Sequence, residues 1–344
     1  MLQYSGKRRQ TTSFTIGGVG IGSDYPVSIQ SMTNTDTRDA QATLTQIGQL
    51  AEAGCQMVRV AVPDEEAASA LKIICAESPV PVIADIHFNH RLALMAMDNG
   101  ISSLRINPGN IGSEEKVREV VSQAKAMQIP IRIGVNAGSL EKDLLAKYQH
   151  PTAEALVESA MRHVRILEDL NFDQIKISLK ASDVPLMIAA YRLMAEQVPY
   201  PLHLGVTEAG NAKHGIVKSA IGIGTLLAEG IGDTIRVSLT GNPLQEIPVA
   251  KQILRSLDLY PKGVEIISCP TCGRTQIALE QLVDAVDQMV SKVDKPLKLA
   301  VMGCVVNGPG EAREADLGIA DHLAVLDVAA ADGAHRGHLE YLAY

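Results

Sequence analysis

Three cysteines and one glutamate near the C-terminus are the residues of this chain best suited to hold a metal. Cys269 and Cys272 form a Cys-x-x-Cys pair, and Cys304 begins a second loop, rich in glycine and proline, that reaches Glu311. A Cys-x-x-Cys pair brings two thiolates to one metal, and a third cysteine completes a three-thiolate pocket to which a carboxylate can add a fourth ligand. This ligand set predicts an iron–sulfur cluster with one exchangeable iron, and therefore redox chemistry on a bound substrate.

A structural zinc site is the alternative that the same ligands leave open. Zinc accepts three cysteines with a carboxylate, and a Cys-x-x-Cys pair alone does not discriminate between the two metals. The chain lacks the second Cys-x-x-Cys or histidine pair that zinc ribbons usually have, which favours the cluster. Cys55 and Cys75 lie in or beside helical patterns among alanine, leucine and isoleucine, and we interpret them as packing residues.

A second group of polar residues recurs at the C-terminal ends of predicted strands. Arg105 and Asn107 share one face of a strand, whereas the alternate residues Leu104 and Ile106 are apolar. The same reading of all the strands gives the following set: Ser31, Arg59, Asp85, His87, Arg105, Asn107, Arg132, Asn136, Ser178, Lys180, Glu208, Arg236 and Ser238. We expect these side chains to share one cavity.

The charges of this set predict an anionic ligand. Five strands each contribute a cation, whereas only Asp85 and Glu208 contribute a carboxylate. Buried cations repel one another unless anions neutralise them, and arginine forks suit phosphate oxygens. A set of structural ion pairs is the alternative. Among the other histidines, we expect His203 to be structural and His163 to lie at the surface.

The elements that must position these residues alternate between strand and helix. The strands are expected at residues 26–32, 57–62, 80–86, 103–108, 131–137, 174–180, 202–208 and 234–239. Helical patterns such as 40–53 and 153–170 lie between them, and a closing helix is expected at 243–257. This order predicts an α/β fold, a (β/α)₈ barrel of the TIM type, whose sites lie at the C-terminal ends of its strands. Residues 138–150 are long for a loop and predict a lid.

A break at residues 258–263 predicts a linker to a second domain. Beyond it we expect a strand at 264–268, a helix at 276–293 and a strand at 297–302. The cysteines follow the strands, in loops whose backbone N–H groups can point at sulfur. The expected domains are therefore a TIM-type barrel over residues 1–257 and a small α+β domain over residues 258–344.

Composition excludes several classes of function. The net charge of −8 and the absence of a basic run argue against nucleic-acid binding. No apolar stretch is long enough to span a membrane, and the N-terminus lacks the apolar core of a signal peptide. We therefore expect a cytoplasmic protein, in which cysteines stay reduced and available to metals.

Long motifs resemble those of the 4-hydroxy-3-methylbut-2-enyl diphosphate synthase family of the non-mevalonate isoprenoid pathway. CPTCGRT at 269–275 and MGCVVNGPGE at 302–311 are similar to its two cluster motifs. The barrel motifs that match are QSMTNT at 30–35, ADIHF at 84–88, RINPGNIG at 105–112, RIGVNAGSL at 132–140, SLKAS at 178–182, LGVTEAG at 204–210 and RVSLT at 236–240. The resemblance extends to about residue 319, and the tail at 320–344 departs from it, either as a divergent ending or through a reading-frame change.

The resemblance implies a reaction and a cofactor. The substrate is 2-C-methyl-D-erythritol 2,4-cyclodiphosphate, which is reduced by two electrons, opened and dehydrated to (E)-4-hydroxy-3-methylbut-2-enyl diphosphate. The electrons come from flavodoxin or ferredoxin through a [4Fe–4S] cluster held by Cys269, Cys272, Cys304 and Glu311. The family is typically a head-to-tail homodimer, in which the linker acts as a hinge.

The resemblance also implies roles for the barrel residues. The positions that hold the diphosphate match Arg59, Arg105, Arg132, Lys180, Arg236 and Ser238, and those lining the same mouth match Asp85, His87, Asn107, Asn136 and Glu208. Glu208 is our candidate for proton transfer, because dehydration needs an acid near the departing oxygen. Two alternatives are kept: a redox-inert, diphosphate-binding barrel enzyme of the dihydropteroate synthase kind with a structural zinc domain, and a cluster carrier or redox sensor without catalytic activity.

Overall fold

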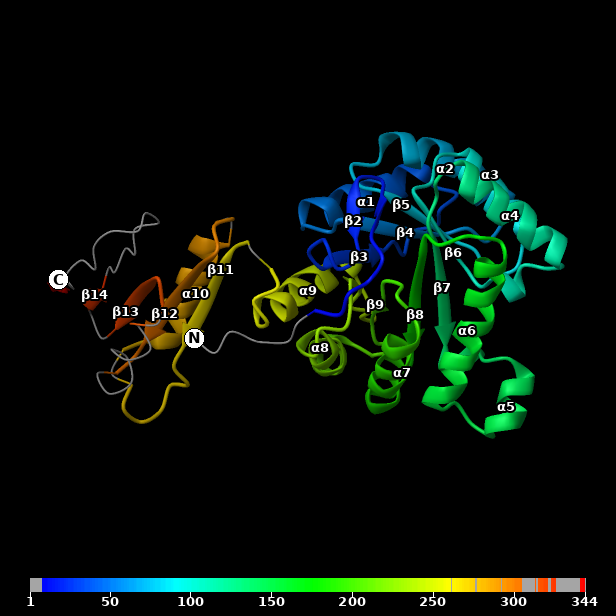
Figure 1. The fold of residues 1–344 in the computed structure, drawn as a ribbon. Coiled ribbons are helices and arrows are strands. Elements are labelled where there is room, and N and C mark those ends of the chain that lie inside the picture. Colours follow the sequence, from blue (N-terminus) through cyan, green and yellow to red (C-terminus); the bar gives the residue numbers. More distant parts are fainter. Residues whose placement is uncertain are drawn as a thin grey trace. The chain divides into compact units, whose positions relative to one another are not determined.

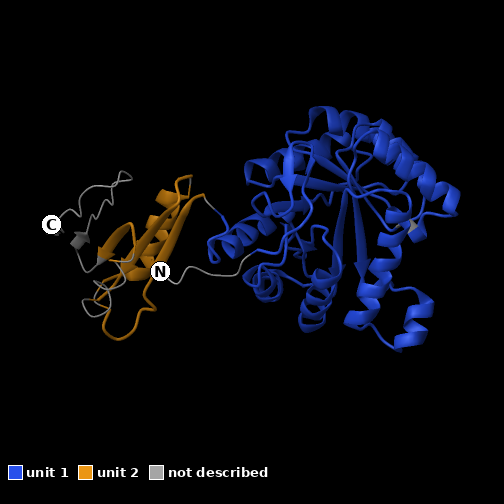
Figure 2. Ribbon diagram, viewed as in Figure 1, with its two compact units in different colours: residues 1–260 blue, residues 261–344 orange. Residues whose placement is uncertain are grey.

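The computed structural model describes residues 8–260, 262–275, 277–291, 293–304, 313, 315–320, 323–325 and 341–343. The chain divides into two compact units, Met1–Tyr260 and Pro261–Tyr344 (Figure 2). Glu311, the expected fourth cluster ligand, lies outside the described residues. No helix in the described part of the chain is long and apolar enough to cross a membrane.

The first unit is a barrel of eight parallel strands in the order β8-β7-β6-β5-β4-β3-β10-β9 (Figure 1). The strands are β3 (Ser28–Met32), β4 (Met57–Ala61), β5 (Val82–Asp85), β6 (Ser103–Ile106), β7 (Ile131–Asn136), β8 (Ile175–Lys180), β9 (His203–Leu204) and β10 (Thr234–Ile235). An isolated parallel bridge between Ile177 and Leu202 joins the two ends of this sheet. The predicted TIM-type barrel is confirmed.

Helices surround the barrel, one after nearly every strand, and bury its outer face (Figure 1). They are α1 (Ala40–Glu52), α2 (Glu65–Glu77), α3 (His90–Asp98), α4 (Glu114–Ala126), α6 (Ala153–Asp169), α7 (Val184–Gln197), α8 (Ala212–Ala228) and α9 (Glu246–Arg255). Val58 and Val60 of β4 belong to the aliphatic core against these helices, while Arg59 between them faces the interior. Strand alternation therefore turns alternate residues of each strand toward the site.

A short hairpin that the sequence reasoning did not include lies at the N-terminal end of the barrel. Strands β1 (Phe14–Ile16) and β2 (Val19–Ile21) pair in antiparallel fashion. Their residues Ile16 and Ile21 form an apolar cluster with Met57 and Ile83 of the barrel strands. This cluster fills the end of the barrel opposite the polar residues.

Strands β9 and β10 are shorter than the expected ranges 202–208 and 234–239. Their chains still approach closely beyond the paired residues, because the backbone N–H of Arg236 donates to the carbonyl of Leu204 (2.9 Å). A side chain at Gly205 would place its Cβ only 2.7 Å from the carbonyl oxygen of Arg236. The segments therefore leave regular pairing but keep their place at the barrel mouth.

The segment expected as a lid contains η2 (Ala137–Ser139) and α5 (Lys142–Tyr148). Helix α5 is joined to α6 by side-chain contacts, since Lys147 pairs with Glu158 (2.6 Å) and Arg162 pairs with Asp143 (2.7 Å). The lid function stays a prediction. Two further 3₁₀ turns, η1 (Pro108–Asn110) and η3 (Pro243–Gln245), lie after β6 and before α9.

The second unit is a five-stranded sheet in the order β11-β12-β13-β14-β15 with helix α10 (Leu279–Val290) packed on it. Its strands are β11 (Val264–Ser268), β12 (Leu297–Met302), β13 (Leu317–Ala320), β14 (Leu323–Val325) and β15 (Tyr341–Ala343). The first three strands are parallel and the last two are antiparallel. The described parts of the tail thus add β14 and β15 to the sheet, at 320–344, where the motif resemblance ends.

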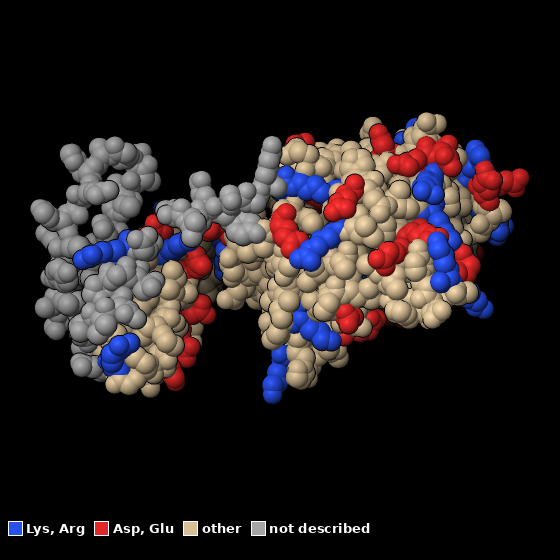
Figure 3. Space-filling view, turned by 60° about the horizontal axis from the view of Figure 1, so that its bottom comes forward, with Lys and Arg blue, Asp and Glu red and all other residues tan. Residues whose placement is uncertain are grey.

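The surface carries both signs of charge close together. On the face drawn in Figure 3, basic and acidic side chains are interspersed over the barrel unit. Exposed ion pairs such as Arg118 with Glu114 (2.6 Å) contribute to this mixture.

Candidate active site

Asp85 lies at the centre of the cations in the barrel mouth. Its two carboxylate oxygens face different guanidinium groups: Oδ1 lies 3.1 Å from Nη1 of Arg105, and Oδ2 lies 3.5 Å from Nε of Arg59. Burial acts to raise the pKa of Asp85, but these two arginines and Arg132 lower it to about 2. Asp85 therefore carries its negative charge at any ordinary pH and offsets part of the positive charge around it.

Arg105 links the ends of three neighbouring strands. Besides Asp85, its guanidinium contacts Nε2 of His87 (2.8 Å) and donates to the carbonyl of Gly134 (2.8 Å). The N–H of Gly134 in turn donates to Oδ1 of Asn107 (3.0 Å). These contacts fix β5, β6 and β7 relative to one another at the mouth. His87 is exposed, and its pKa is lowered by burial of part of the ring and by Arg105, while Asp85 acts to raise it.

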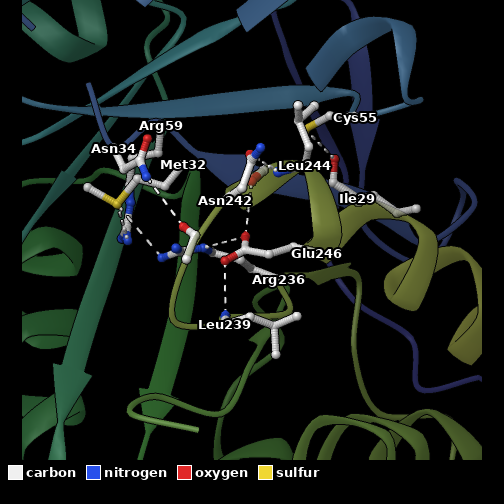
Figure 4. Close-up of polar contacts among 12 residues, drawn as sticks. Ile29, Met32, Asn34, Cys55, Arg59, Arg236, Leu239, Asn242, Leu244 and Glu246 are labelled. Carbon is white, nitrogen blue, oxygen red and sulfur yellow. Dashed lines mark hydrogen bonds and ion pairs between the residues drawn. The ribbon is translucent and has the colours of Figure 1, made fainter. Parts of the chain in front are cut away.

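Arg236 is held by a carboxylate that the sequence reasoning missed. Its Nε lies 3.6 Å from Oε2 of Glu246, the first residue of α9, which is buried (Figure 4). Ser31 also donates to Glu246 (3.1 Å) and therefore points toward α9, not into the mouth as expected. The neighbouring Met32 faces the mouth instead, where its sulfur accepts hydrogen bonds from Arg59 (3.0 Å) and Arg236 (3.7 Å).

The placement of Ser31 has a simple cause. Side chains alternate along a strand, so Ser31 and Met32 of β3 must face opposite sides. The outward face of β3 also includes Ile29, whose carbonyl accepts a weak hydrogen bond from the buried thiol of Cys55 (3.8 Å; Figure 4). Burial raises the pKa of Cys55 to about 11, so this thiol is protonated and packs as predicted. Glu246 gave a weak signal in the sequence, because it starts a helix rather than ending a strand.

Arg132 and Lys180 have no acidic partner among the described residues. Arg132 is only 1% exposed, and its Nε and Nη1 make no hydrogen bond within the described part of the chain. Burial lowers the pKa of Arg132, and the charges of Arg59 and Arg105 lower it further. Lys180 is 5% exposed, and its pKa is lowered first by burial and then by Arg236 and Arg59. Arg132 and Lys180 are thus two buried basic side chains whose charged forms a bound anion would favour.

The ion-pair alternative accounts for only part of the set. Arg59 and Arg105 share Asp85, and Arg236 has Glu246, but neither carboxylate neutralises Arg132 or Lys180. Asp85, His87, Asn107, Asn136, Lys180, Arg236 and Ser238 lie at or just beyond the C-terminal ends of their strands. Arg59 and Arg105 reach Asp85 from within β4 and β6, and Arg132, the second residue of β7, starts deeper in the barrel. Ser178 is buried on β8 and donates to the carbonyl of Ile133 (3.3 Å). Glu208 follows β9 at the same end, is exposed, and has a positive φ angle of 46°.

Two further residues lie below this mouth. Lys176 is on β8, four residues before Lys180 and on the same face, and it is 1% exposed. His203 starts β9, is fully buried, and its Nδ1 lies 2.7 Å from the hydroxyl of Thr234. The sequence reasoning left Lys176 out, although the alternation Lys176, Ser178, Lys180 along one strand was a signal for it.

The cysteines of the second unit follow the C-terminal ends of two adjacent strands, and we call this end of the sheet, with Cys269, Cys272 and Cys304, the cysteine edge. Cys269 follows β11 and Cys304 follows soon after β12, and these strands pair in parallel with Ser268 opposite Val301. The backbone N–H of Gly303 donates to Sγ of Cys269 (3.4 Å). Cys304 is buried, Cys269 is half-buried and Cys272 is exposed. The edge therefore presents thiols with a backbone N–H aimed at one of them.

Arg274 brings positive charge to these thiols. A hydrogen bond with the Cys272 side chain raises the pKa of Arg274 first, and the charges of Cys272 and Cys304 add to this effect. The pKa of Cys272 is lowered, chiefly by a hydrogen bond from the Arg274 backbone and then by its side chain. A low thiol pKa favours the thiolate that metals require.

The three cysteine thiols are suitable ligands for a metal ion or an iron–sulfur cluster, although the described residues do not form a complete metal site. Within the ranges that the structure describes, no three histidine, cysteine, aspartate or glutamate side chains are grouped closely enough to hold a metal ion. Glu311 lies outside those ranges. The observations that support a fit are the soft sulfur donors on adjacent strand ends and the N–H directed at sulfur.

Comparison with protein families gives two matches along the chain. The family model described as the GcpE TIM-barrel domain matches residues 11–251, and that of the GcpE protein C-terminal domain matches residues 265–334. The second match continues past residue 319, where the motif resemblance was expected to end. The barrel and the cysteine-bearing unit are thus both matched.

Curated relatives share most of their sequence with this chain. The 4-hydroxy-3-methylbut-2-en-1-yl diphosphate synthase (flavodoxin) of Geobacter sulfurreducens is 61% identical over 313 residues, which cover 91% of this chain and 89% of the relative. The protein of the same name from Clostridium perfringens is 60% identical over 313 residues, which cover 91% of this chain and 90% of the relative.

Solved structures of low identity share the barrel fold. Dihydropteroate synthase from Stenotrophomonas maltophilia superposes with a TM-score of 0.53 at 12% identity, over 72% of this chain and 97% of that chain. A truncated 3-deoxy-D-arabino-heptulosonate 7-phosphate synthase from Thermotoga maritima gives a TM-score of 0.51 at 12% identity, over 83% of this chain and 95% of that chain. At this identity the similarity concerns the fold alone.

Proposed function

The chain belongs to the GcpE family of 4-hydroxy-3-methylbut-2-en-1-yl diphosphate synthases, and from this premise we propose which of its residues carry each part of the reaction. It is an oxidoreductase of isoprenoid biosynthesis that opens 2-C-methyl-D-erythritol 2,4-cyclodiphosphate reductively to (E)-4-hydroxy-3-methylbut-2-enyl diphosphate. The reaction consumes two electrons and two protons and releases one water. The alternative of a redox-inert enzyme of the dihydropteroate synthase kind is not favoured, because that likeness concerns the fold alone.

The barrel mouth binds the diphosphate in this proposal. The observation that carries it is the pair of buried cations, Arg132 and Lys180, that have no acidic partner among the described residues. A cyclic diphosphate carries one negative charge on each phosphorus, which matches this surplus. Guanidinium groups donate two parallel hydrogen bonds to phosphate oxygens, and the ammonium of Lys180 adds a point charge.

The paired arginines serve the same ligand from fixed positions. Asp85 holds Arg59 and Arg105, and Glu246 holds Arg236, so these guanidinium groups are oriented before the substrate arrives. As the ring opens, negative charge builds up on the departing phosphate oxygen, and preoriented cations stabilise it without having to reorganise. We assign hydrogen-bonding roles along the mouth to His87, Asn107, Asn136 and Ser238.

Glu208 is the proposed proton donor for the departing hydroxyl. It follows β9 at the mouth and is exposed, with its backbone held at a positive φ angle that only a few non-glycine residues adopt. A carboxylic acid within reach of the departing oxygen would allow it to leave as water.

The family is an iron–sulfur family, and we propose a [4Fe–4S] cluster on Cys269, Cys272, Cys304 and Glu311. When bound, such a cluster supplies the electrons and a Lewis-acidic iron. The N–H of Gly303 and the positive charge of Arg274 would stabilise the thiolates. A carboxylate ligand binds iron less firmly than a thiolate does, which suits a position that has to exchange.

We also propose an electron donor and an oligomeric state. The names of the relatives support flavodoxin as the donor, and ferredoxin is the other candidate. A head-to-tail homodimer stays a prediction, and so does a cytoplasmic location.

An anaerobic assay tests the function directly. Protein with its metal reconstituted is given the cyclodiphosphate and a chemical reductant, and the product is identified by mass. Iron and zinc are measured in the same sample. We expect the linear, dehydrated diphosphate and iron in excess of zinc. Stoichiometric zinc without iron, together with unchanged substrate, would refute the proposal.

A further inference from the structure

The barrel interior holds a deeper layer of polar groups below the mouth. Lys176, His203 and Gln30 are each at most 1% exposed. The Nζ of Lys176, the Nε2 of His203 and both amide atoms of Gln30 have no hydrogen-bond partner among the described residues. Buried polar groups are normally hydrogen-bonded, so these side chains keep donor and acceptor capacity that a ligand can use.

Lys176 is placed directly beside the uncompensated part of the mouth. It lies opposite Arg132 in the register of β7 and β8, and on the same face as Lys180. The charged groups that face it are Arg132 on β7, Arg59 on β4 and Asp233 before β10. His203 on β9 lies within reach of the same charges, including that of Lys176.

Asp233, the acidic residue that acts on Lys176 among the residues that the structure describes, is already engaged elsewhere. Asp233 pairs with Arg8 (2.9 Å) and accepts a hydrogen bond from the backbone N–H of Leu202 (2.8 Å). Thr11 donates to the same carboxylate (3.2 Å). Lys176 is therefore a buried amine among cations, and none of the described residues lies in hydrogen-bonding or ion-pair contact with it.

Burial and like charge act on this amine in the same direction. Burial lowers the pKa of Lys176 well below its usual range, and the charge of Arg132 lowers it further, while Asp233 acts to raise it. The pKa of His203 is lowered by the same causes, burial first. A buried lysine can lose its charge at neutral pH in such surroundings.

We propose that Lys176 is a second-layer anion-binding residue that is uncharged in the free enzyme and takes up a proton when the cyclodiphosphate enters the mouth. The inference rests on the proposed function, because it takes the cyclodiphosphate as the ligand. Two negative charges above Lys176 offset the repulsion from Arg132 and favour the ammonium form. The new charge then strengthens the hold on the diphosphate.

The direction of the resulting pH dependence follows from this coupling. The bound state carries one proton more than the free state in the window between the two pKa values of Lys176. Binding therefore becomes tighter as the pH falls through that window. The cyclodiphosphate does not contribute, since each of its phosphorus atoms bears only a strongly acidic hydroxyl and stays ionised throughout.

Calorimetry of substrate binding tests the proposal. The anaerobic holoenzyme, without reductant so that no turnover occurs, is titrated with the cyclodiphosphate in buffers of different ionisation enthalpy. The dependence of the heat on the buffer gives the number of protons taken up. We expect net uptake by the wild-type enzyme at slightly alkaline pH, and little or none in Lys176→Met, with binding about tenfold weaker. The matched control Lys72→Met removes an exposed lysine of α2 and should leave both quantities unchanged.

The outcomes separate this inference from the proposed function. Binding without proton uptake by the wild-type enzyme at any pH between about 6 and 9 would overturn the role of Lys176 and leave the function intact. Uptake that persists in Lys176→Met would also overturn it, by assigning the proton to Lys180 or His203, whose pKa values burial and neighbouring positive charge also lower. Absence of binding would overturn the proposed function itself. If Lys176→Met fails to fold, Lys176→Arg replaces it: an arginine at this position stays charged in the free enzyme, so binding should then proceed without the proton uptake seen in the wild type, and unchanged uptake would overturn the proposal.

Discussion

The barrel mouth and the cysteine edge hold their reactive groups in different ways. In the mouth, cations lie on several strands of one barrel or just beyond them, and Asp85 and Glu246 orient three of them, Arg59, Arg105 and Arg236, through contacts of 3.1 to 3.6 Å. At the cysteine edge, the sulfurs lie on loops that follow strands, and Sγ of Cys269 accepts a hydrogen bond from the backbone N–H of Gly303 (3.4 Å). The side chains of the mouth are thus oriented by one another, whereas the described contact at the cysteine edge runs from backbone to sulfur.

The difference reflects what each ligand can contribute. A diphosphate is bound and released in each turnover, so its site has to be preorganised to bind quickly and selectively. A cluster stays bound, and metal–thiolate bonds can order the loops that hold it. The sizes of the cores agree with this division. The barrel core is continuous around the whole sheet, whereas the described core of the second unit is a small cluster around Val301 and Leu299.

The largest expected effect comes from removing a thiol at the cysteine edge. We expect Cys304→Ser to lose most of its iron and to lower turnover by about a thousandfold or more, because the hydroxyl is a poor ligand for a soft iron site. The matched control is Cys75→Ser, which changes a half-buried cysteine of the barrel whose pKa burial raises to about 12. Iron content per chain and turnover are the measurements. Full iron content in Cys304→Ser would contradict the ligand assignment.

A smaller effect, confined to the mouth, should distinguish unpaired from paired arginines. We expect Arg132→Met to lower kcat/KM by about a hundredfold while leaving the free energy of unfolding unchanged or higher, since its charge has no acidic partner among the described residues. Arg236→Met should instead destabilise the fold by about 3 kcal/mol, because it leaves the buried carboxylate of Glu246 without its cation.

Urea unfolding and steady-state kinetics of both variants measure this contrast. Equal losses of stability in the two variants would mean that Arg132 is held by a partner as Arg236 is. The preassembled character of the mouth would then apply to every arginine in it.

The sequence predictions were most successful where the alternation of side chains along a strand decides by itself which way each side chain points. Period-two patterns between helical segments predict the barrel and the order of its strands along the chain. They also predict that the following side chains point inward: Arg59, Arg105, Arg132 and Lys180. The same rule, applied one residue out of register, gave the wrong side for Ser31. A shift of one residue turns a side chain to the opposite face, so a polar residue adjacent to a strand end is ambiguous without its partner.

Contacts between distant segments could not be predicted in this way. Glu246 reaches Arg236 from the start of α9, and the hairpin of β1 and β2 closes the barrel end from a segment left unassigned. The turn Gly17-Gly18 with positive φ angles was a local signal for that hairpin. His163, expected at the surface, is 3% exposed, because its ring accepts a hydrogen bond from another loop. A single sequence gives no indication of such a partner.

The smallest expected effect concerns this histidine, which joins two loops of the mouth. Nδ1 of His163 accepts the N–H of Gly109 (3.0 Å), which follows the strand of Arg105 and Asn107. Its Nε2 lies 3.4 Å from Glu141, at the start of α5. Because Nδ1 accepts this hydrogen bond, it carries no proton, and the imidazole ring of His163 is neutral. Burial lowers the pKa of His163, although Glu141 acts to raise it.

The sign of the pH effect follows from that lowered pKa. The unfolded chain binds a proton near pH 6.5 and the folded chain only at lower pH, so the contribution of His163 to stability is complete above 6.5 and is lost as the pH falls toward the folded pKa. We expect His163→Leu to lose about 1 to 2 kcal/mol at pH 8, because the Gly109 N–H stays buried without an acceptor, and to show a weaker loss of stability on acidification than the wild type. His163→Gln keeps a hydrogen-bond acceptor, so it should recover part of the lost stability and have a KM close to that of the wild type.

Urea unfolding at pH 8 and pH 5.5 measures the stability of each variant, and steady-state kinetics measure its KM. An identical pH dependence of stability in the wild type and His163→Leu would show that the preassembly of the mouth does not depend on this contact.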